Sequence, residues 1–594
     1  LLHQALLVEL DDLGSDAAQG EVGGDTLLGH FVFNKAGNCQ SGAAGAGLDG
    51  EAVLEIAGGH DGLGGRLGDQ QVAGVLGITG GARGDLGAVT INPAGSAMAP
   101  YSQITITPGI TVASTTAEGV SPYDNGHLPY FQRKLKSDLT KFNLPNIGFS
   151  INFDTGRSYG LVNWTLGFIV NKTADYNQDV YANGLNSTTS FLGRMAYEAS
   201  VNGYYPDELA GSNAYDMGIP WKYVTGYQSA MFDPFNDIYV GATEKVYDDN
   251  TCVLAGELDQ SYGRRTSGSK YEYIVNAGFN FSDFIYFGIN LGVNSMSYSY
   301  TEYFKEEAVN YRDFLVEIKD DQGNIVSSSY FNRMKYKSGY SFAGTGYFAK
   351  FGVIVNPFKG FRVGATFQTP TRMEIDESWE DEGQTDFSGP DGKSWSSLSP
   401  IGENSWVFTS PLKVSLGAAY TLGQLGTISA DYEFSNYGNL RYRSSAFTDR
   451  STLEYINDDI KACYGGSHNI RAGIEIKPTP EFAIRGGYEM KTSAQKAIWD
   501  SYAGSNGGYV DLTGRDLTHK ASFGIGYSSK GSFFADAAVT RVFMPREYFF
   551  PYDDYMFIGE DEAGRPIIDS NYFAPEILIK SALWKVTLTL GFRF

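Results

Sequence analysis

The chain has 594 residues and a formal net charge of −23 at pH 7. Nucleic-acid binding calls for a basic face, so this acidic balance argues against it. A transmembrane helix needs about 18 or more consecutive apolar residues, and the sequence contains no such run. Membrane-spanning β-strands are not excluded, because only their alternate residues face lipid.

Residues 1–79 differ in composition from the rest of the chain. They are rich in Gly, Ala, Leu and Asp, and the first Tyr or Trp is Tyr101. The formal GxGxxG of residues 45–50 lacks the preceding strand and following helix that a dinucleotide site requires. A flexible leader, an extension of an internal plug or a gene-start artefact would each explain the segment. We favour the last, and expect the mature N-terminus to lie near Gly80 or to be replaced by another sequence.

A turn is predicted where residues 80–101 lead into the first alternating segment. Asn92, Pro93, Ala94 and Gly95 form this turn. Proline fixes φ and removes a donor, and the Asn92 side chain can bond its own backbone. The turn is either a functional corner close to a ligand route or an ordinary loop before a strand.

From there on, segments with a period of two, which is typical of β-strands, alternate with loops. Tight turns, such as Ser282-Asp283, join them in pairs, whereas long loops separate the pairs. The fourteen predicted strands span residues 104–112, 146–154, 161–171, 271–281, 284–298, 340–356, 361–369, 412–422, 427–434, 468–477, 482–490, 519–528, 532–543 and 581–594. An even number of strands with short turns on one side and long loops on the other predicts an all-β, 14-stranded antiparallel transmembrane β-barrel of the outer-membrane type.

The last strand supports this prediction most directly. In the final WKVTLTLGFRF, every second residue from Trp584 to Phe594 is apolar. An uncovered strand of this kind would risk aggregation in a soluble protein, whereas a barrel pairs it with the first strand. Both chain ends then lie on the periplasmic side.

Several motifs, taken in order, resemble the FadL-type family of outer-membrane transporters for long-chain fatty acids and other hydrophobic compounds. They are the NPAG turn, FGVIVNPFKGFRVGATFQTPT (351–371), GTISADYEFSNYG (426–438), NIRAGIEIKPTPEFAIRGGYEM (469–490) and SFGIGYSSKGSFFADAAV (522–539). The loops resemble those of Bacteroidetes-like relatives. The resemblance implies a plug, or hatch, in residues 80–101 inside a barrel of residues 102–594, with long extracellular loops.

The resemblance also implies passive uptake of hydrophobic molecules. Ligand would bind the outer loops, enter the lumen and leave sideways through a gap in the wall. It further implies that Phe594 is read by the barrel-assembly machinery. The expected partners are a hydrophobic small molecule, outer-membrane lipid and lipopolysaccharide, and the expected state is a monomer. The acidic run of residues 374–382 is interpreted as a solvated loop face or a divalent-cation bridge to lipopolysaccharide.

Two groups of residues are candidates for a functional site. The first is a set of ligand-capture residues in the outer loops, which could equally do no more than pack the loops together: Leu128, Tyr130, Phe131, Phe191, Leu192, Met195, Trp221 and Tyr223. The second is a set of opposite charges on one hairpin: Arg471, Glu475, Arg485 and Glu489. These four form either a charged constriction that anchors a ligand carboxylate or, as we favour, a salt-bridge network that grips the plug.

The sequence offers no enzymatic or metal site. It has no nucleophile elbow, and no pair of its six histidines has metal-ligand spacing. We therefore expect no enzyme activity, cofactor or metal. Of the three cysteines, Cys252 and Cys463 would both lie in outward loops. The sequence leaves open whether these two form a disulfide. A polar-solute porin and a surface adhesin that binds through its long loops remain the alternative functions.

Overall fold

The computed structural model describes residues 86–120, 131–247, 252–319, 325–444, 454, 457–458, 460–462, 464–492, 494, 517–544, 547–549, 551–552, 557–560, 566–568 and 575–594. Leu128, Tyr130 and Cys463 lie outside these residues, so the predictions made for them stay untested.

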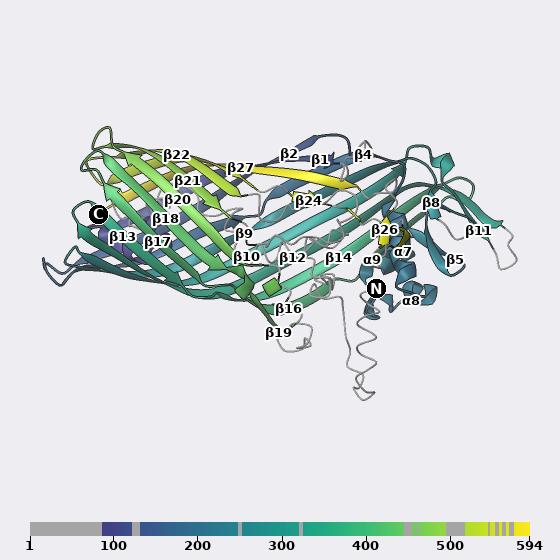
Figure 1. The fold of residues 1–594 in the computed structure, drawn as a ribbon, viewed down its shortest axis with the longest axis horizontal. Coiled ribbons are helices and arrows are strands. Elements are labelled where there is room, and N and C mark those ends of the chain that lie inside the picture. Colours follow the sequence, from purple (N-terminus) through teal and green to yellow (C-terminus); the bar gives the residue numbers. More distant parts are fainter. Residues whose placement is uncertain are drawn as a thin grey trace, which may run out of the picture.

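A closed ring of fourteen antiparallel strands forms the body of the protein (Figure 1). In chain order these are β1 (Gln103–Val120), β2 (Leu135–Asp154), β3 (Leu161–Asp175), β9 (Leu258–Phe281), β10 (Ile285–Ala308), β12 (Ile325–Phe358), β13 (Phe361–Gln368) continued by β14 (Arg372–Ser388), β16 (Gly402–Thr409) continued by β17 (Lys413–Thr421), β18 (Gly426–Asn436) continued by β19 (Arg441–Ser444), β20 (Gly466–Ile476), β21 (Phe482–Lys491), β22 (Thr518–Ser528), β23 (Phe533–Phe543) and β27 (Glu576–Arg593). The predicted fold class is confirmed.

The smaller elements lie before the first strand and in the long connections. They are α6 (Leu86–Ile91), η1 (Pro93–Met98), β4 (Gln178–Asn186), α7 (Phe191–Val201), α8 (Pro206–Ala210), η2 (Ala214–Asp216), α9 (Trp221–Gln228), β5 (Phe232–Phe235), β6 (Ile238–Gly241), β7 (Glu244–Val246), β8 (Cys252–Leu254), η3 (Tyr311–Asp313), β11 (Leu315–Lys319), β15 (Ser394–Leu398), η4 (Tyr437–Asn439), β24 (Glu547–Phe549), β25 (Phe557–Glu560) and β26 (Pro566–Ile568). No helix among the described residues is both long and apolar enough to cross a membrane.

The ring closes between the first and last strands, as predicted. β1 pairs with β27 from Gln103–Arg593 onward. Ser102 and Phe594 exchange backbone hydrogen bonds of 3.0 and 2.9 Å. Both strands meet at the end of the barrel that carries the short turns, which we call the hairpin end; the C-terminus marks it in Figure 1. At this end Ser282 and Asp283 both have positive φ (57° and 55°), the conformation of a two-residue hairpin turn that matches strand twist.

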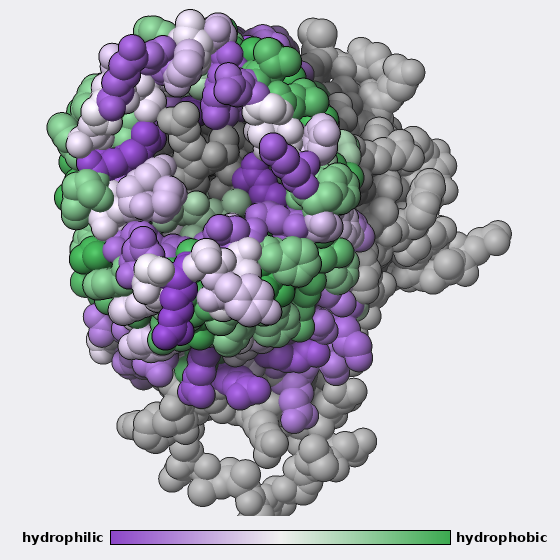
Figure 2. All heavy atoms as spheres, turned by 90° about the vertical axis from the view of Figure 1, so that its left-hand side faces the viewer, coloured by the Kyte–Doolittle hydropathy of each residue, from purple (hydrophilic) through white to green (hydrophobic). Residues whose placement is uncertain are grey.

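An apolar belt surrounds the barrel towards its hairpin end. Each of the fourteen wall strands contributes exposed apolar side chains: Ile104, Phe149, Phe168, Val275, Phe287, Phe351, Phe367, Leu416, Ile428, Ile470, Ile484, Phe523, Val539 and Leu588 are examples, one per strand. Figure 2, which looks onto the hairpin end, shows green apolar side chains on the circumference and hydrophilic side chains around the opening. A belt of this kind fits the hydrocarbon core of a bilayer. The protein is therefore an outer-membrane β-barrel.

Above the belt, the polarity of the two strand faces is reversed. On β10, Asn290 and Asn294 point into the lumen while Leu291 is exposed on the outside. Further along the same strand Tyr298 and Tyr300 point inward, and the outward residues are serines and a threonine. The predicted strands stop near this reversal, whereas β10 continues to Ala308 and β12 begins as early as Ile325. The barrel consequently extends well beyond the membrane on the loop end.

Candidate functional site

The segment before the first strand folds inside the barrel. Asn92 caps η1 by accepting a hydrogen bond from the Ala94 N–H at 3.1 Å, and Pro93 occupies the first position of that helix. All four residues of the predicted turn, Asn92 to Gly95, are buried. The local conformation predicted for the turn is thus present. We call α6 and η1 together the plug.

Neutral amides from three wall strands hold the plug. The side-chain amides of Asn163, Asn276 and Asn290 donate to the carbonyls of Ala97, Pro93 and Val89 at 3.2, 3.1 and 2.9 Å, respectively. Lys350 Nζ adds a bond of 2.8 Å to the Thr90 carbonyl, and the Asn92 amide donates to the Val353 carbonyl at 3.2 Å. These bonds satisfy plug carbonyls that burial would otherwise leave without partners.

Glycines allow the plug to lie directly against the wall. A Cβ at Gly288 would lie 2.2 Å from the Pro93 carbonyl carbon, and one at Gly352 would lie 2.0 Å from Asn92 Oδ1. No side chain fits at such distances, so glycine is required at both positions. The sequence shows these glycines but not which segment approaches them.

The four charged residues predicted to form a network do so, with partners from neighbouring strands. Arg471 forms an ion pair with Asp431 and a second, at 3.3 Å, with Glu433. Arg485 lies 2.8 Å from Glu475 and also pairs with Asp536; Glu489 lies 3.1 Å from Lys520. We call this set the charged wall: Asp431, Glu433, Arg471, Glu475, Arg485, Glu489, Lys520 and Asp536.

The ion pairs of the charged wall connect wall strands. Those described run between β18, β20, β21, β22 and β23. Residues 80–85 of the predicted plug lie outside the described residues, so a grip of this network on the plug stays a prediction. The plug is anchored on β3, β9, β10 and β12. Buried charges need close partners of opposite sign, and other wall strands supply them.

A second region of the lumen, on strands that adjoin the charged wall, is aromatic. We call the inward side chains of β10, β12, β14, β16 and β19 above the plug the aromatic wall: Met296, Tyr298, Tyr300, Tyr340, Phe342, Met373, Ile375, Trp406, Phe408 and Tyr442. Trp406 is 1% exposed and its ring centroid lies 4.6 Å from that of Tyr442. This apolar surface lies between the plug and the loop end.

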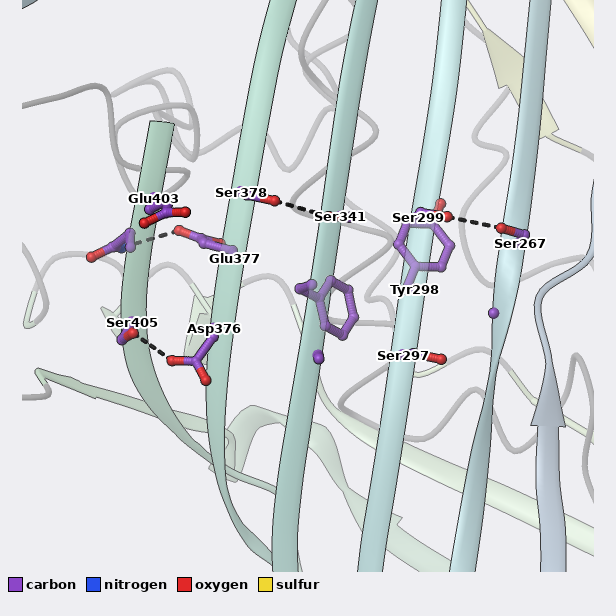
Figure 3. Close-up of a pocket in the computed structure, with 14 residues that line it drawn as sticks. Ser267, Ser297, Tyr298, Ser299, Ser341, Asp376, Glu377, Ser378, Glu403 and Ser405 are labelled. Carbon is purple, nitrogen blue, oxygen red and sulfur yellow. Dashed lines mark hydrogen bonds between the residues drawn. The ribbon is translucent and has the colours of Figure 1, made fainter. Parts of the chain in front are cut away.

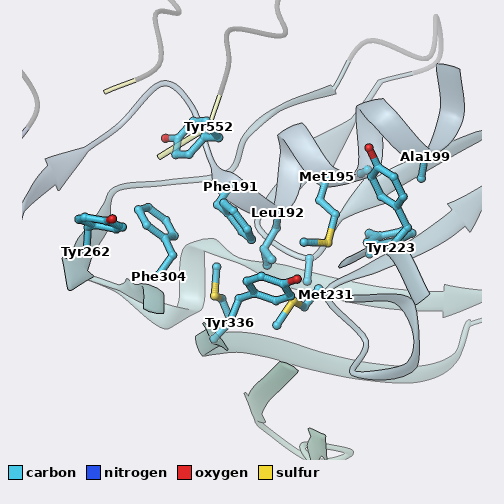
Figure 4. Close-up of a cluster of buried hydrophobic side chains, with 14 of the residues drawn as sticks. Phe191, Leu192, Met195, Ala199, Tyr223, Met231, Tyr262, Phe304, Tyr336 and Tyr552 are labelled. Atoms are coloured by element: carbon cyan, nitrogen blue, oxygen red, sulfur yellow. The ribbon is translucent and has the colours of Figure 1, made fainter. Parts of the chain in front are cut away.

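The long connection between β4 and β9 packs across the inward face of the wall at the loop end (Figure 4). Its helix α7 coincides with the helix predicted from the apolar spacing of Phe191, Leu192 and Met195. These side chains, together with Phe131, Trp221 and Tyr223, are buried in one hydrophobic cluster. In this conformation the capture residues that the structure describes contact one another and the wall.

A buried carboxylate fixes the N-terminus of α7. Glu306 on β10 accepts hydrogen bonds from Ser190 Oγ (2.9 Å), the Phe191 N–H (2.8 Å) and Gln260 Nε2 (2.7 Å). Burial raises the pKa of Glu306 to about 7, although these hydrogen bonds oppose the rise. The sequence prediction does not include Glu306, because the predicted strand ends at residue 298 whereas β10 continues to Ala308; the period of two in residues 299–308 is the signal that could have identified it.

Strand pairing in the wall is interrupted between β2 and β3. Their ladder ends at the Asn146–Asn171 pair, and above it the described residues of β2 pair only with β1 and those of β3 only with β9. Pro145, which immediately precedes Asn146, has no N–H to continue a ladder. Beyond β3, β4 continues the ladder on β9 from the Gln178–Thr266 pair and lies against β1 and β2. Gln178 also donates to Ser581 Oγ on β27 at 2.7 Å. We call the interruption of pairing between β2 and β3 the wall gap.

A shallow groove also crosses the outer surface of β9, β10, β12, β14 and β16 above the apolar belt (Figure 3). Serines from neighbouring strands line it: Ser267 bonds Ser299 at 2.8 Å and Ser341 bonds Ser378 at 2.9 Å. Asp376 and Glu403, at one end, add negative charge. The groove faces away from the lumen, and its hydroxyls are largely satisfied by one another.

Comparison with known proteins finds matches among solved structures only: no family model and no curated protein matches the chain. A FadL homologue of Pseudomonas aeruginosa is similar over 89% of this chain and 99% of its own, with 10% identity and a TM-score of 0.46. The toluene transporter TodX of P. putida is similar over 85% and 94%, with 11% identity and a TM-score of 0.42. The monoaromatic hydrocarbon channel CymD is similar over 89% and 97%, with 10% identity and a TM-score of 0.37.

The first of these structures carries the name of the family that the sequence motifs resemble. All three TM-scores lie below 0.5, so we argue function from the residues of this chain. Those residues define an outer-membrane barrel that encloses α6 and η1, has an aromatic inner surface and lacks β2–β3 pairing above Asn146.

Proposed function

We propose that the protein carries hydrophobic small molecules passively across the outer membrane, by a route that leaves the barrel sideways. The wall gap between β2 and β3 is the observation that carries this proposal. A polar solute leaves a channel along its axis, whereas an apolar molecule gains free energy by moving directly into lipid. The gap lies where the outer face is still apolar, since Ile147 and Phe149 flank it from below.

The other features of the lumen suit the same route. The plug is anchored by hydrogen bonds near the hairpin end, which opposes axial flow of water. The aromatic wall offers an apolar surface between the loop end and the gap. The hydrophobic cluster of α7 and α9 closes the loop end and is the natural place for first contact with ligand, after a displacement of α7. Long-chain fatty acids are the substrates we propose, on the resemblance of the sequence motifs. No enzymatic step is needed.

Uptake and conductance together test the proposal. Cells that lack their own hydrophobic-compound transporters, and that express this protein, should gain uptake of oleate or toluene. The purified protein in planar bilayers should show no steady large conductance. Steady large channels together with unchanged uptake would instead establish a polar-solute porin. Host-cell binding that is lost on removal of residues 187–257, with no uptake in any strain, would establish an adhesin.

A further inference from the structure

Arg541 on β23 faces the membrane and not the lumen. Its neighbours Thr540 and Val542 are buried and point inward. Val539 and Phe543, which share its side of the strand, are exposed on the outer face. An arginine on the lipid side is unfavourable at the bilayer midplane and is tolerated near the interfaces, where it reaches polar head groups.

The contacts of Arg541 with described residues are aromatic and not ionic. Its Cζ lies 4.5 Å from the centroid of the Phe543 ring and 4.8 Å from that of Trp584. Its Nε is shielded from solvent and has no hydrogen-bond partner among the described residues. Ring contacts orient a guanidinium but leave its N–H groups without acceptors. An anion beside the rings would supply those acceptors.

The membrane boundary lies close to Arg541. The strands β21, β22 and β23 contain 10, 11 and 11 residues, about the length that a tilted strand needs to cross a bilayer. Arg541 lies two residues before the end of β23 that points towards the long loops. On the other side of the barrel, β10 and β12 continue well beyond this level (Figure 1). The guanidinium therefore lies at the level of the head groups of the outer leaflet, since the short turns of such barrels are periplasmic.

A tyrosine–histidine pair lies on the same outer surface, two strands away. Tyr488 on β21 pairs across the ladder with Ala521 on β22, which in turn pairs with Arg541. Partners across an antiparallel ladder share a face, so Tyr488 also points outward. Its hydroxyl lies 2.7 Å from Nδ1 of His519. The strand spacing separates Tyr488 and Arg541 by roughly 10 Å, with only the methyl group of Ala521 between them.

The polar groups of this surface match a phosphate group. A guanidinium offers two parallel N–H groups to phosphate oxygens. When Nδ1 of a neutral imidazole accepts a hydroxyl, its hydrogen lies on Nε2, which donates to a further oxygen. Phosphate presents several acceptor oxygens and carries the negative charge that the guanidinium lacks nearby.

The charge of the surroundings also favours an anion here. Lys580 on β27 and Lys134 on β2 share one carboxylate, that of Glu118, at 2.9 Å each. Two ammonium groups and one carboxylate leave this outer surface positive. The serine-lined groove on β9–β16 carries Asp376 and Glu403 instead (Figure 3). An anionic lipid would need an intervening cation at that groove but not beside Arg541.

We propose that Arg541, Tyr488 and His519 bind the phosphate of an outer-leaflet glycolipid whose acyl chains lie on the apolar belt. Lipopolysaccharide has this chemistry, because its lipid A carries phosphates on acylated sugars. The guanidinium and the imidazole donate to the phosphate, and the rings of Phe543 and Trp584 hold the guanidinium in place. The inference goes beyond the proposed function, since it concerns the outer face and is independent of what passes through the lumen.

Equilibrium binding of lipid A to the full-length protein in detergent micelles tests this inference. The probes are diphosphoryl lipid A and the same lipid without its phosphates. The wild-type protein should bind the phosphorylated form about tenfold or more tightly, and Arg541→Gln should abolish most of this preference. Arg541→Lys, which keeps the charge but not the planar fork, should retain part of it. His519→Ala should weaken binding of the phosphorylated form by about threefold.

Two variants serve as matched controls. Arg372→Gln removes an exposed arginine from the outward face of β14. His468→Ala disrupts a second pair of the same kind, in which Tyr432 Oη lies 2.6 Å from His468 Nδ1 on the outer face of β18 and β20. Both controls should leave the preference unchanged. Arg541→Gln should assemble, because it removes a charge from a lipid-facing surface; if it does not, the loss expected for His519→Ala decides the matter.

Three results would overturn the inference. The first is equal binding of the two lipids by the wild type, or a preference that persists in Arg541→Gln. The second is an equal loss in Arg372→Gln, which would mean that any outward arginine suffices. The third is full displacement of lipid A by inorganic phosphate, which would assign the site to the free ion and not to a lipid.

Discussion

The charged wall and the aromatic wall lie on adjoining strands of one barrel, meet at the strand formed by β18 and β19, and are stabilised in different ways. On the charged wall, Arg471 and Arg485 each contact two carboxylates, and the pair of Arg485 with Asp536 spans β22. On the aromatic wall, side chains such as Trp406 and Tyr442 exclude water by packing. The described bonds to the plug come from the amides of Asn163, Asn276 and Asn290 and from Lys350. The contrast separates two ways of stabilising the inner surface: ion pairs connect the strands of the charged wall, and packing of apolar side chains connects those of the aromatic wall.

The largest effect should come from removing one cation of the charged wall. Arg471→Met leaves the buried carboxylates of Asp431 and Glu433 without their partner, which should destabilise the barrel by about 3–5 kcal/mol. The shift of the unfolding midpoint in urea, read by tryptophan fluorescence, measures this. The double variant Arg471→Met/Asp431→Asn should recover a large part of the loss. An unchanged midpoint for the single variant would mean that these charges do not stabilise the wall.

The next effect distinguishes the anchoring of the plug from the stability of the wall. Gly352→Ala places a methyl group where Asn92 Oδ1 now lies, so the plug should shift. Conductance in planar bilayers should then rise. The overpacking should lower the stability of the folded protein by about 1–3 kcal/mol. Gly339→Ala is a matched control on the same strand, because its new Cβ would meet no atom closer than 3.7 Å. Equal conductance of the two variants would contradict the described contact between plug and wall.

A smaller, pH-dependent effect is expected at the loop end. Glu306 differs from the charged wall in that its hydrogen bonds come from neutral donors. Burial raises its pKa from 4.5 to about 7, so the docked state of α7 holds a proton that the undocked state releases. The contribution of this group to docking is complete below pH 4.5 and is lost as pH rises towards 7.

Hydrogen exchange of the α7 amides measures this linkage. The opening equilibrium of α7 should rise by up to about tenfold per pH unit between pH 5 and 7 and level off above it. In Glu306→Gln, which cannot ionise, the opening equilibrium should not change with pH over this range. A wild-type opening equilibrium that is equally independent of pH would refute the link between Glu306 and α7.

The sequence predicts those parts of the barrel whose two faces meet lipid and a polar lumen. In the belt, apolar and polar residues alternate along β10 from Ile285 onward and along β27. This alternation correctly predicts the strands, the turns between them and their even number. Above the belt, the inward residue Tyr298 is aromatic and the outward residue Ser299 is polar, which is the reverse of the belt. A search for strands with an apolar outer face therefore ends this strand too early.

The candidate site was predicted less completely, for a related reason. Opposite charges spaced along one hairpin identify Arg471 and Glu489 as partners in a network, but the plug's own anchors are asparagines far apart in sequence, such as Asn163 and Asn276. Each is unremarkable as a polar residue in a strand. The sequence does not predict the wall gap either, because the gap is defined by where the β2–β3 ladder ends, and a strand pattern does not show where pairing stops.

Obstruction of the wall gap tests the central proposal most directly. Asn143 lies on β2 just above the last β2–β3 pair and donates to Thr111 Oγ1 at 2.8 Å, so its side chain faces inward at the gap. A cysteine at this position, in a background whose three native cysteines are replaced by serine, can be modified with a bulky maleimide. A cysteine at Ser295, on the outer face of β10, is the control. We predict that modification at residue 143 abolishes uptake of oleate while modification at residue 295 leaves it unchanged; undiminished uptake after complete modification at residue 143 would contradict a route through the wall.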